Sequence, residues 1–241
     1  MSKGKYSRKS GFVVRPIALV LAAVLLMGAS IGGTLAWLTA KTDDVVNTFT
    51  VGDVSITLKE TEMRYNNDNE PTYETAPEAT VQNEYFMIPG TKYMKDPVVE
   101  VVDGSEDCYL FVKAVETNSP SKYMDYAYTM DTDSNWHEYI DVTQNNVRTV
   151  VWYRTVEKND DLKHWYLLSA DAENQYENGY VGIKSSILKK GSVETDENPV
   201  MPDENSAPSL VFTAYAAQMA NLSVEEAWDQ VKDLPTTGSG T

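Results

Sequence analysis

Alternating apolar and polar residues recur in short segments from residue 54 onward. Residues 54–58 alternate in this way, and residues 108–116 place an apolar set on a single face. A period of two residues is typical of a strand with one buried face. The face that we expect in the core is formed by Cys108, Leu110, Val112 and Ala114. Further strands are predicted over residues 147–156, 164–169, 180–187 and 210–218.

Turn-forming residues separate these predicted strands. Pro89-Gly90 and Asp103-Gly104 are turn sequences. Residues 60–84 carry an Asn-rich stretch and two prolines without apolar periodicity, so they are predicted to form a long exposed loop. Spaced strands with Gly, Pro, Asn and Asp between them predict a mainly all-β fold, an antiparallel β-sandwich.

One short helix is predicted near the C-terminus. Ser223 and Glu226 have the spacing of a capping box, in which each side chain binds the backbone N–H of the other residue. Ala227, Trp228 and Val231 then form an apolar stripe. We expect this helix to pack on a sheet.

The N-terminus has the pattern of an export signal. Residues 1–15 are basic, and residues 16–40 carry no charge. Thr34 and Ala36 place small residues before a signal-peptidase cut at Trp37. The alternative is a retained membrane anchor, because 25 uncharged residues are long enough to cross a bilayer. We predict a signal peptide over 1–36, with its apolar part at 16–36, a single domain over 37–233 and a flexible tail over 234–241.

The predicted exported chain is strongly acidic. The whole chain has a net charge of −16, and removal of the first 36 residues leaves 15 basic against 36 acidic residues, a net charge of −21. Such a surface repels nucleic acid and anionic lipid, so neither is expected as a partner. Solubility, calcium binding and contact with a basic partner all remain open as its role.

The one cysteine, Cys108, excludes an internal disulfide framework. Its place in an apolar strand favours a buried thiol over a reactive one. Stability must therefore come from packing or from assembly.

Two sequence features after the apolar segment carry a family resemblance. GGTLA, residues 32–36, precedes the predicted cut, and NTFTVG, residues 47–52, leads into the first predicted strand. Together they resemble the start of TasA and camelysin family proteins, which are matrix and surface proteins of Gram-positive bacteria. The match covers residues 28–58 and recurs more weakly at residues 88–101 and 212–218.

The resemblance implies a fold, an export pathway and a function. It implies that the sandwich is a jelly roll and that the chain is secreted, or associated with the cell surface, through a dedicated SipW-type signal peptidase. It further implies a structural subunit of an extracellular biofilm matrix or fibre that assembles with itself or with related matrix proteins. On this reading the chain is not an enzyme and needs no cofactor, and it meets the membrane only through the uncleaved N-terminal segment.

The segment that follows the predicted cut is apolar enough to act as an assembly strand. Cleavage would free an extended arm over residues 37–49 whose apolar residues are available for burial. The arm either pairs as the first strand of its own chain or completes a sheet in the next copy by β-strand addition. Its candidate assembly residues are Trp37, Leu38, Val45, Val46 and Phe49.

A zinc metallopeptidase is the first alternative function, because camelysin-like proteins have been classed as such. A zinc-binding helix presents two His four residues apart with a Glu beside the first. His137 and Glu138 give the start of this pattern, but Asp141 occupies the second His position, and the only other histidine is His164. We expect no metal site at these residues.

Two further patterns are incomplete. Asp131, Asp133 and Asn135 imitate the start of a calcium loop, but Trp136 and Val142 stand where the loop needs Gly and Glu, so a solvated turn is expected. A sortase signal LPxTG is spelled by Leu234, Pro235, Thr236, Thr237 and Gly238. In the sortase substrates that it resembles, an apolar span and a basic tail follow the motif, but here only three residues follow it, so a flexible end is expected. A sortase-anchored surface binding module is the second alternative function.

Overall fold

The computed structural model describes residues 39–41, 48–51, 53–68, 70–73, 83–173 and 175–234. Contacts divide the chain into Met1–Leu38 and Thr39–Thr241, and all described residues belong to the second unit. This unit is mainly β, with antiparallel pairing in nearly every sheet, which confirms the predicted all-β class. Within these residues no helix is long and apolar enough to cross a membrane.

Most strands are short, and three are ten residues long. The strands are β1 (Thr39–Lys41), β2 (Thr48–Val51), β3 (Ile56–Lys59), β4 (Met63–Tyr65), β5 (Pro71–Tyr73), β6 (Glu84–Phe86), β7 (Lys92–Met94), β8 (Val98–Val101), β9 (Cys108–Thr117), β10 (Met124–Asp125), β11 (His137–Gln144), β12 (Val147–Val156), β13 (His164–Tyr166), β14 (Tyr180–Ile183) and β15 (Ser209–Gln218). The helices are α2 (Pro120–Tyr123), α3 (Val224–Val231) and the 3₁₀ turns η1 (Thr129–Asp131) and η2 (Glu204–Ser206).

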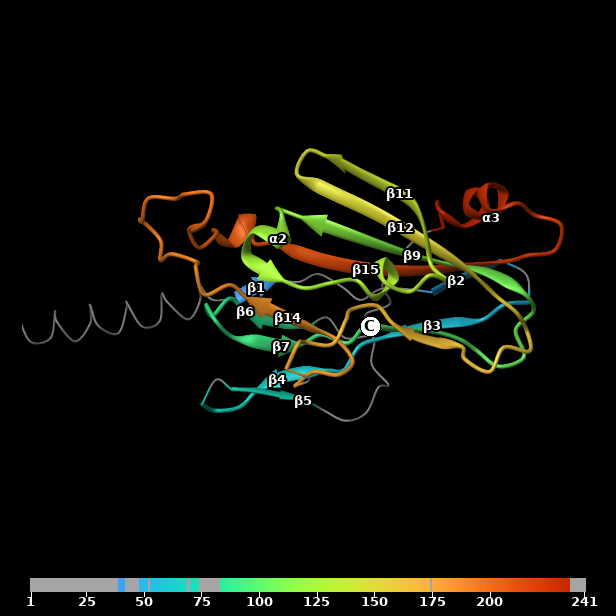
Figure 1. Cartoon of the computed structure of the whole chain (residues 1–241), viewed down its shortest axis with the longest axis horizontal. Coiled ribbons are helices and arrows are strands. Elements are labelled where there is room, and N and C mark those ends of the chain that lie inside the picture. Colours follow the sequence, from blue (N-terminus) through green and yellow to red (C-terminus); the bar gives the residue numbers. More distant parts are fainter. Residues whose placement is uncertain are drawn as a thin grey trace, which may run out of the picture. The chain divides into compact units, whose positions relative to one another are not determined.

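The long strands form a five-stranded sheet in the order β11-β12-β9-β15-β2 (Figure 1). Ten residue pairs join β9 to β12, and ten more join β9 to β15, all antiparallel. The edge strand β2 runs parallel to β15. The predicted strands 147–156 and 210–218 are confirmed here as β12 and β15.

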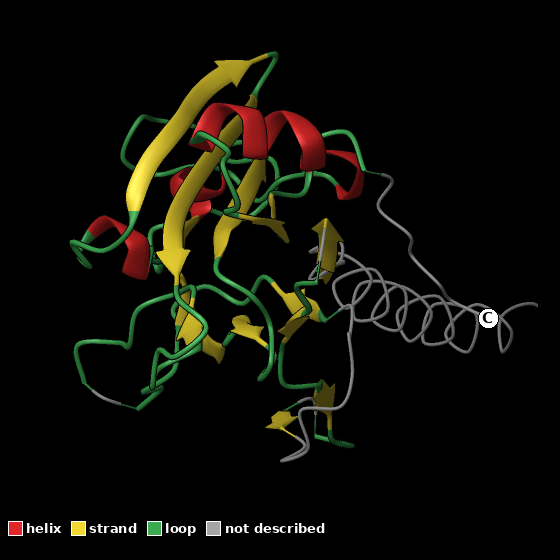
Figure 2. Ribbon diagram, turned by 90° about the vertical axis from the view of Figure 1, so that its right-hand side faces the viewer, coloured by secondary structure: helices red, strands yellow, loops and turns green. Residues whose placement is uncertain are grey.

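The short strands form a second layer beside this sheet (Figures 1 and 2). Its sheets have the orders β13-β8-β3, β10-β14-β7, β1-β6 and β4-β5. The main core lies between the layers and includes Leu110 and Phe212 from the long strands and Val99 and Tyr93 from the short ones. The predicted core face of β9 is confirmed, because Cys108, Leu110, Val112 and Ala114 are all fully buried.

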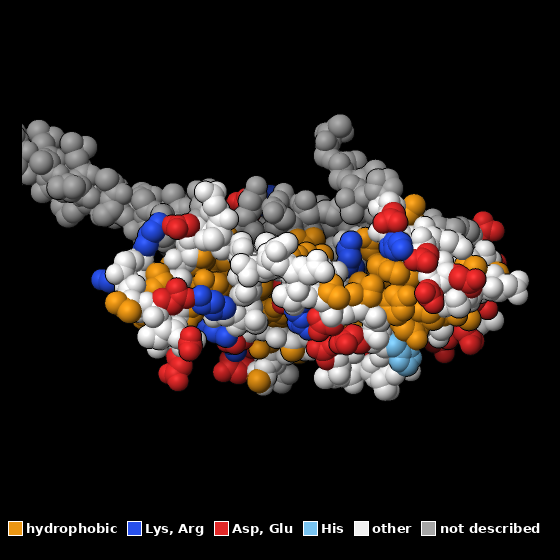
Figure 3. Space-filling view, turned by 90° about the horizontal axis from the view of Figure 1, so that it is seen from above, with side chains coloured by type: hydrophobic (Ala, Val, Ile, Leu, Met, Phe, Trp, Pro, Cys, Tyr) orange, Lys and Arg blue, Asp and Glu red, His pale blue; other side chains and the backbone are white. Residues whose placement is uncertain are grey.

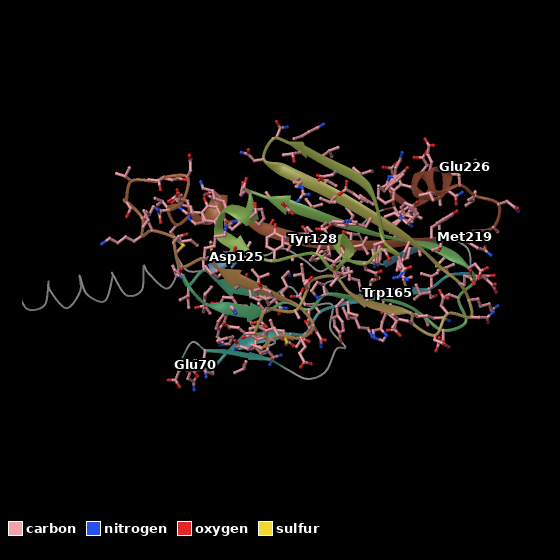
Figure 4. The ribbon with its side chains drawn as sticks, in the orientation of Figure 1. Glu70, Asp125, Tyr128, Trp165, Met219 and Glu226 are labelled. Carbon is pink, nitrogen blue, oxygen red and sulfur yellow. The ribbon has the colours of Figure 1, made fainter. Side chains whose placement is uncertain are left out.

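The opposite face of the five-stranded sheet is also covered. Phe111 and Tyr215 point to this side and pack with Ala227, Trp228 and Val231 of α3. Both capping-box bonds between Ser223 and Glu226 are present, so the predicted helix and its apolar stripe are confirmed. The labelled Glu226 and Trp165 lie on opposite sides of the long strands (Figure 4).

The prediction of a long exposed loop over residues 60–84 is wrong for the part that the structure describes, and residues 69 and 74–82 lie outside it. Residues 63–73 form the β4-β5 hairpin. Asn66 stabilises its turn, since its side-chain Oδ1 accepts hydrogen bonds from the backbone N–H groups of Asp68 and Glu70, both at 2.9 Å. Strands of three residues are too short to show a period of two in the sequence. Tertiary packing, and not a local pattern, stabilises them. Glu60 and Asn83, at the two ends of the predicted loop, are buried.

Two further predicted strands are shorter than expected. The segment 164–169 is a strand only over β13, and 180–187 only over β14. After Ile183 the chain turns, with the Ile187 backbone N–H donating to the Lys184 carbonyl. Ile187 nevertheless remains buried, which explains why the apolar pattern continues past the end of the strand.

Candidate assembly site

Of the predicted N-terminal arm over residues 37–49, the structure describes β1 and the first two residues of β2. Phe49 lies in β2. The other predicted cleavage and assembly residues, Thr34, Ala36, Trp37, Leu38, Val45 and Val46, lie outside the described residues. The structure therefore brings the backbone of the arm to two places on its own chain.

The first place is β6. β1 pairs with it antiparallel, with Thr39, Ala40 and Lys41 opposite Phe86, Tyr85 and Glu84. This joins the start of the described arm to the layer of short strands.

The second place is the free edge of β15. Residues Thr48 to Val51 of β2 pair in parallel with Ala214, Tyr215, Ala216 and Ala217. β15 is bonded on its other side to β9. Without β2 the backbone N–H and C=O groups on the outer side of β15 would lack strand partners, which is the situation that promotes pairing with another chain.

The β2 pairing is short compared with its neighbours. It spans four residue pairs, whereas β15 and β9 share ten. Each backbone hydrogen bond contributes about 1 kcal/mol net, and parallel pairing is slightly weaker per residue. β2 is therefore easier to detach from the five-stranded sheet than β12, β9 or β15.

Next to this edge, aromatic residues pack between the outer face of the sheet and α3. Tyr215 is buried between the indole of Trp228, with ring centroids 5.5 Å apart, and Lys113 Nζ, 5.2 Å from the phenol ring centroid. α3 also contacts β2 itself. Seen from above, the molecule presents hydrophobic side chains among acidic and basic ones (Figure 3). The helix thus covers the seam where β2 meets β15.

The opposite edge of the sheet is β11. No described strand pairs with its outer side. Its pairing with β12 is irregular between Glu138 and Ile140, and most of its residues are exposed. A bulge on an edge strand discourages pairing with a second chain, so β15 is the better acceptor of the two edges.

A buried ionic network lies beside the strand that receives β1, and nothing in the sequence pattern indicates it. Glu60 accepts hydrogen bonds from Lys95 Nζ (3.1 and 3.2 Å), from Tyr85 Oη (2.6 Å) and from Asn83 Nδ2 (2.9 Å). All four residues are buried. Burial raises the pKa of Tyr85 well above its ordinary value, and the charge of Glu60 adds to the effect.

The structure does not arrange the residues of the incomplete zinc pattern as a metal site. His137 and Glu138 lie on strand β11, where successive side chains alternate between faces, and not on a helix. His137 and His164 line different pockets. Among the described residues no group of three or more His, Cys, Asp and Glu could hold a metal ion.

Asp131 ends the 3₁₀ turn η1, and Asp133 follows it in a tight turn. The Asp133 carboxylate accepts a hydrogen bond from the Asn135 backbone N–H at 3.0 Å and lies 3.7 Å from the Arg154 guanidinium. Both interactions occupy oxygens that a calcium loop would turn toward the ion.

Only the first residue of the sortase signal is described. Leu234 is partly buried and packs against the cluster formed by α3 and the outer sheet face. Residues 235–241, which hold Pro235 to Gly238, lie outside the described residues. A sortase would have to draw Leu234 out of this cluster.

Comparison of the chain with known protein families, with curated proteins and with solved structures finds no match.

Proposed function

We propose that this chain is an exported structural subunit that assembles into extracellular matrix fibres by exchanging its N-terminal strand between copies. One observation carries the proposal: β2, from the segment just after the predicted cut, is a four-residue parallel strand at the edge of an otherwise antiparallel stretch of sheet. A strand that completes the edge in its own chain fits the same edge in a second copy.

The wider setting supports the same role. The resemblance of residues 28–58 to TasA and camelysin proteins favours secretion through a SipW-type signal peptidase. We further propose that the two layers form a β-sandwich of the jelly-roll type. An attached leader would keep the arm at the membrane, so cleavage would start assembly.

The acidic surface sets a condition for assembly. Subunits of high like charge repel one another, and salt screens this repulsion over about 10 Å at 0.1 M. We therefore expect fibres to grow faster as the salt concentration rises.

A peptide competition tests the proposal. A synthetic peptide of residues 37–51 should occupy the β15 edge and stop fibre growth of the chain that begins at Trp37, as followed by light scattering and electron microscopy. A peptide of the same composition in scrambled order is the matched control. Fibres that grow at the same rate with either peptide, and also from a chain lacking residues 37–51, would show that the arm does not drive assembly.

A further inference from the structure

The network around Glu60 contains the three groups needed to form an amide bond between two side chains. Lys95 Nζ supplies a primary amine, Asn83 a carboxamide, and Glu60 a carboxyl group that contacts both nitrogens. Lys95 Nζ and Asn83 Nδ2 lie 3.2 and 2.9 Å from the same oxygen, Glu60 Oε1. We propose that Lys95 and Asn83 join in a spontaneous intramolecular isopeptide bond, with Glu60 as the proton carrier.

The surroundings keep both the lysine and the glutamate out of water. The side chains of Lys95 and Glu60 are 3% and 0% exposed. The Lys95 ammonium lies 5.5 Å from the ring centroid of Tyr85, whose ring in turn packs on that of Tyr93. In the proposed reaction one proton passes from Lys95 Nζ to the Glu60 carboxylate, which lies 3.1 Å away. The resulting amine is a nucleophile.

The carboxamide of Asn83 is held for attack. Its Oδ1 accepts a hydrogen bond from the Met63 backbone N–H at 2.8 Å, a donor placed to stabilise the negative charge that develops on this oxygen. Its Nδ2 donates to Glu60 Oε1 and to the Thr61 carbonyl, both at 2.9 Å. The leaving nitrogen therefore lies against the group that will protonate it.

The reaction balances without any other reagent. The bond between Lys95 Nζ and Asn83 Cγ forms, and the bond between Cγ and Nδ2 breaks. Of the three protons on the Lys95 ammonium, one stays on Glu60, one passes by way of Glu60 to Nδ2, which departs as ammonia, and one remains on the new amide nitrogen. The Lys95 ammonium, the Glu60 carboxylate and the Asn83 carboxamide become one secondary amide, a neutral Glu60 carboxyl and one ammonia molecule.

Peptide mass spectrometry of the full chain, denatured and digested with trypsin, tests the bond directly. A cross-link would leave residues 65–92 joined to residues 93–113, because trypsin does not cut after an acylated Lys95. The joined peptide should be the main species and should be lighter than the sum of its parts by one ammonia molecule. This readout does not depend on where the leader is cut.

Two variants distinguish the cross-linking reaction from other reactions that release ammonia. Lys95→Arg keeps the charge but should give three separate peptides of full mass, residues 65–92, 93–95 and 96–113, because trypsin cuts after the introduced arginine. Glu60→Gln keeps the shape but should abolish the joined peptide. Ring closure of Asn83 onto its own backbone would also release ammonia, but it would persist in Lys95→Arg and leave the peptides separate. Separate peptides from the unaltered chain, or a joined peptide in Glu60→Gln, would overturn the proposal whether or not a variant folds well.

Discussion

The indole of Trp228 on α3 meets the phenol ring of Tyr215 on β15 edge-on, with the ring planes at 86°. The same indole lies 5.2 Å from the ring centroid of Phe111 on β9. The C-terminal helix is thus fixed to the strand that receives β2 and to the central strand beside it. Stability of the helix and integrity of the acceptor edge are therefore coupled.

Trp228→Ala should destabilise the fold by about 3–5 kcal/mol, because it empties the space between α3 and the two strands. Urea unfolding followed by circular dichroism measures the change. Gln230→Ala, on the exposed side of the same helix, is the matched control and should stay within about 0.5 kcal/mol of the unaltered chain. Equal values for the two variants would contradict the docking of α3.

The capping box should give the helix an acid-sensitive start. The backbone N–H and the hydroxyl of Ser223 donate to Glu226 at 2.9 and 3.0 Å and lower the pKa of its carboxyl. Because the folded pKa lies below the ordinary value of about 4.3, this stabilisation is complete above that value and is lost as pH falls through the folded pKa.

Comparing the unaltered chain with Glu226→Gln between pH 7 and pH 2 measures this effect. The difference in free energy of unfolding should be constant at neutral pH and shrink on acidification. Ser223→Ala should cost about 1 kcal/mol at neutral pH, and Ser223→Asp should retain the cap. A difference that grows as pH falls would contradict the assigned carboxylate bonds.

Cys108 should be inert in the folded protein. Burial raises the pKa of its thiol to about 12, with the charge of Asp107 adding to the effect, and the side chain is fully buried. Since the thiolate is the reactive form, an aromatic disulfide reagent at pH 8 should leave the native chain unlabelled and label it fully in guanidinium chloride. Rapid labelling of the native chain would show that β9 is not where the structure places it.

Gly179 should tolerate a methyl group less well than Gly191. Both have positive φ, +126° and +86°, but a Cβ at Gly179 would lie 2.5 Å from the Lys95 carbonyl oxygen, whereas nothing lies within 4 Å at Gly191. Gly191→Ala should cost about 1–2 kcal/mol from backbone strain alone. Gly179→Ala should cost more, because the backbone at Lys95 must shift, and thermal unfolding of the pair compares the two. Equal losses would mean that this close approach does not exist.

The sequence indicates those elements whose signal is local. β9, β12 and β15 are long enough to show an apolar period, and Ser223 and Glu226 bond within one helical turn. The β4-β5 hairpin is too short for such a signal. The sequence places Phe111 on the face of β9 opposite the core. That face is buried as well, because α3, more than one hundred residues later in the chain, covers it.

The candidate sites depend on pairings between distant segments. That β2 pairs with β15 cannot be read from NTFTVG, because β15 lies far along the chain. Glu60, Asn83 and Lys95 are polar residues at the ends of short strands and give no apolar signal. They are buried together because Asn83 and Lys95, from segments beside β6 and β7, both bond to Glu60 at the end of β3.

The central claim is that β2 passes from one copy to the next, and isotope-mixed cross-linking tests it most directly. Thr50 and Ala216 are opposite one another in the β2–β15 register, so Thr50→Cys and Ala216→Cys, with Cys108→Ser, place two thiols in reach of a short bifunctional reagent. Chains grown in ¹⁴N and ¹⁵N are mixed, assembled and cross-linked, and the linked peptides are weighed. Strand exchange predicts linked peptides that combine one light and one heavy partner in the assembled material. Linked peptides that are always wholly light or wholly heavy would show that each arm stays on its own chain.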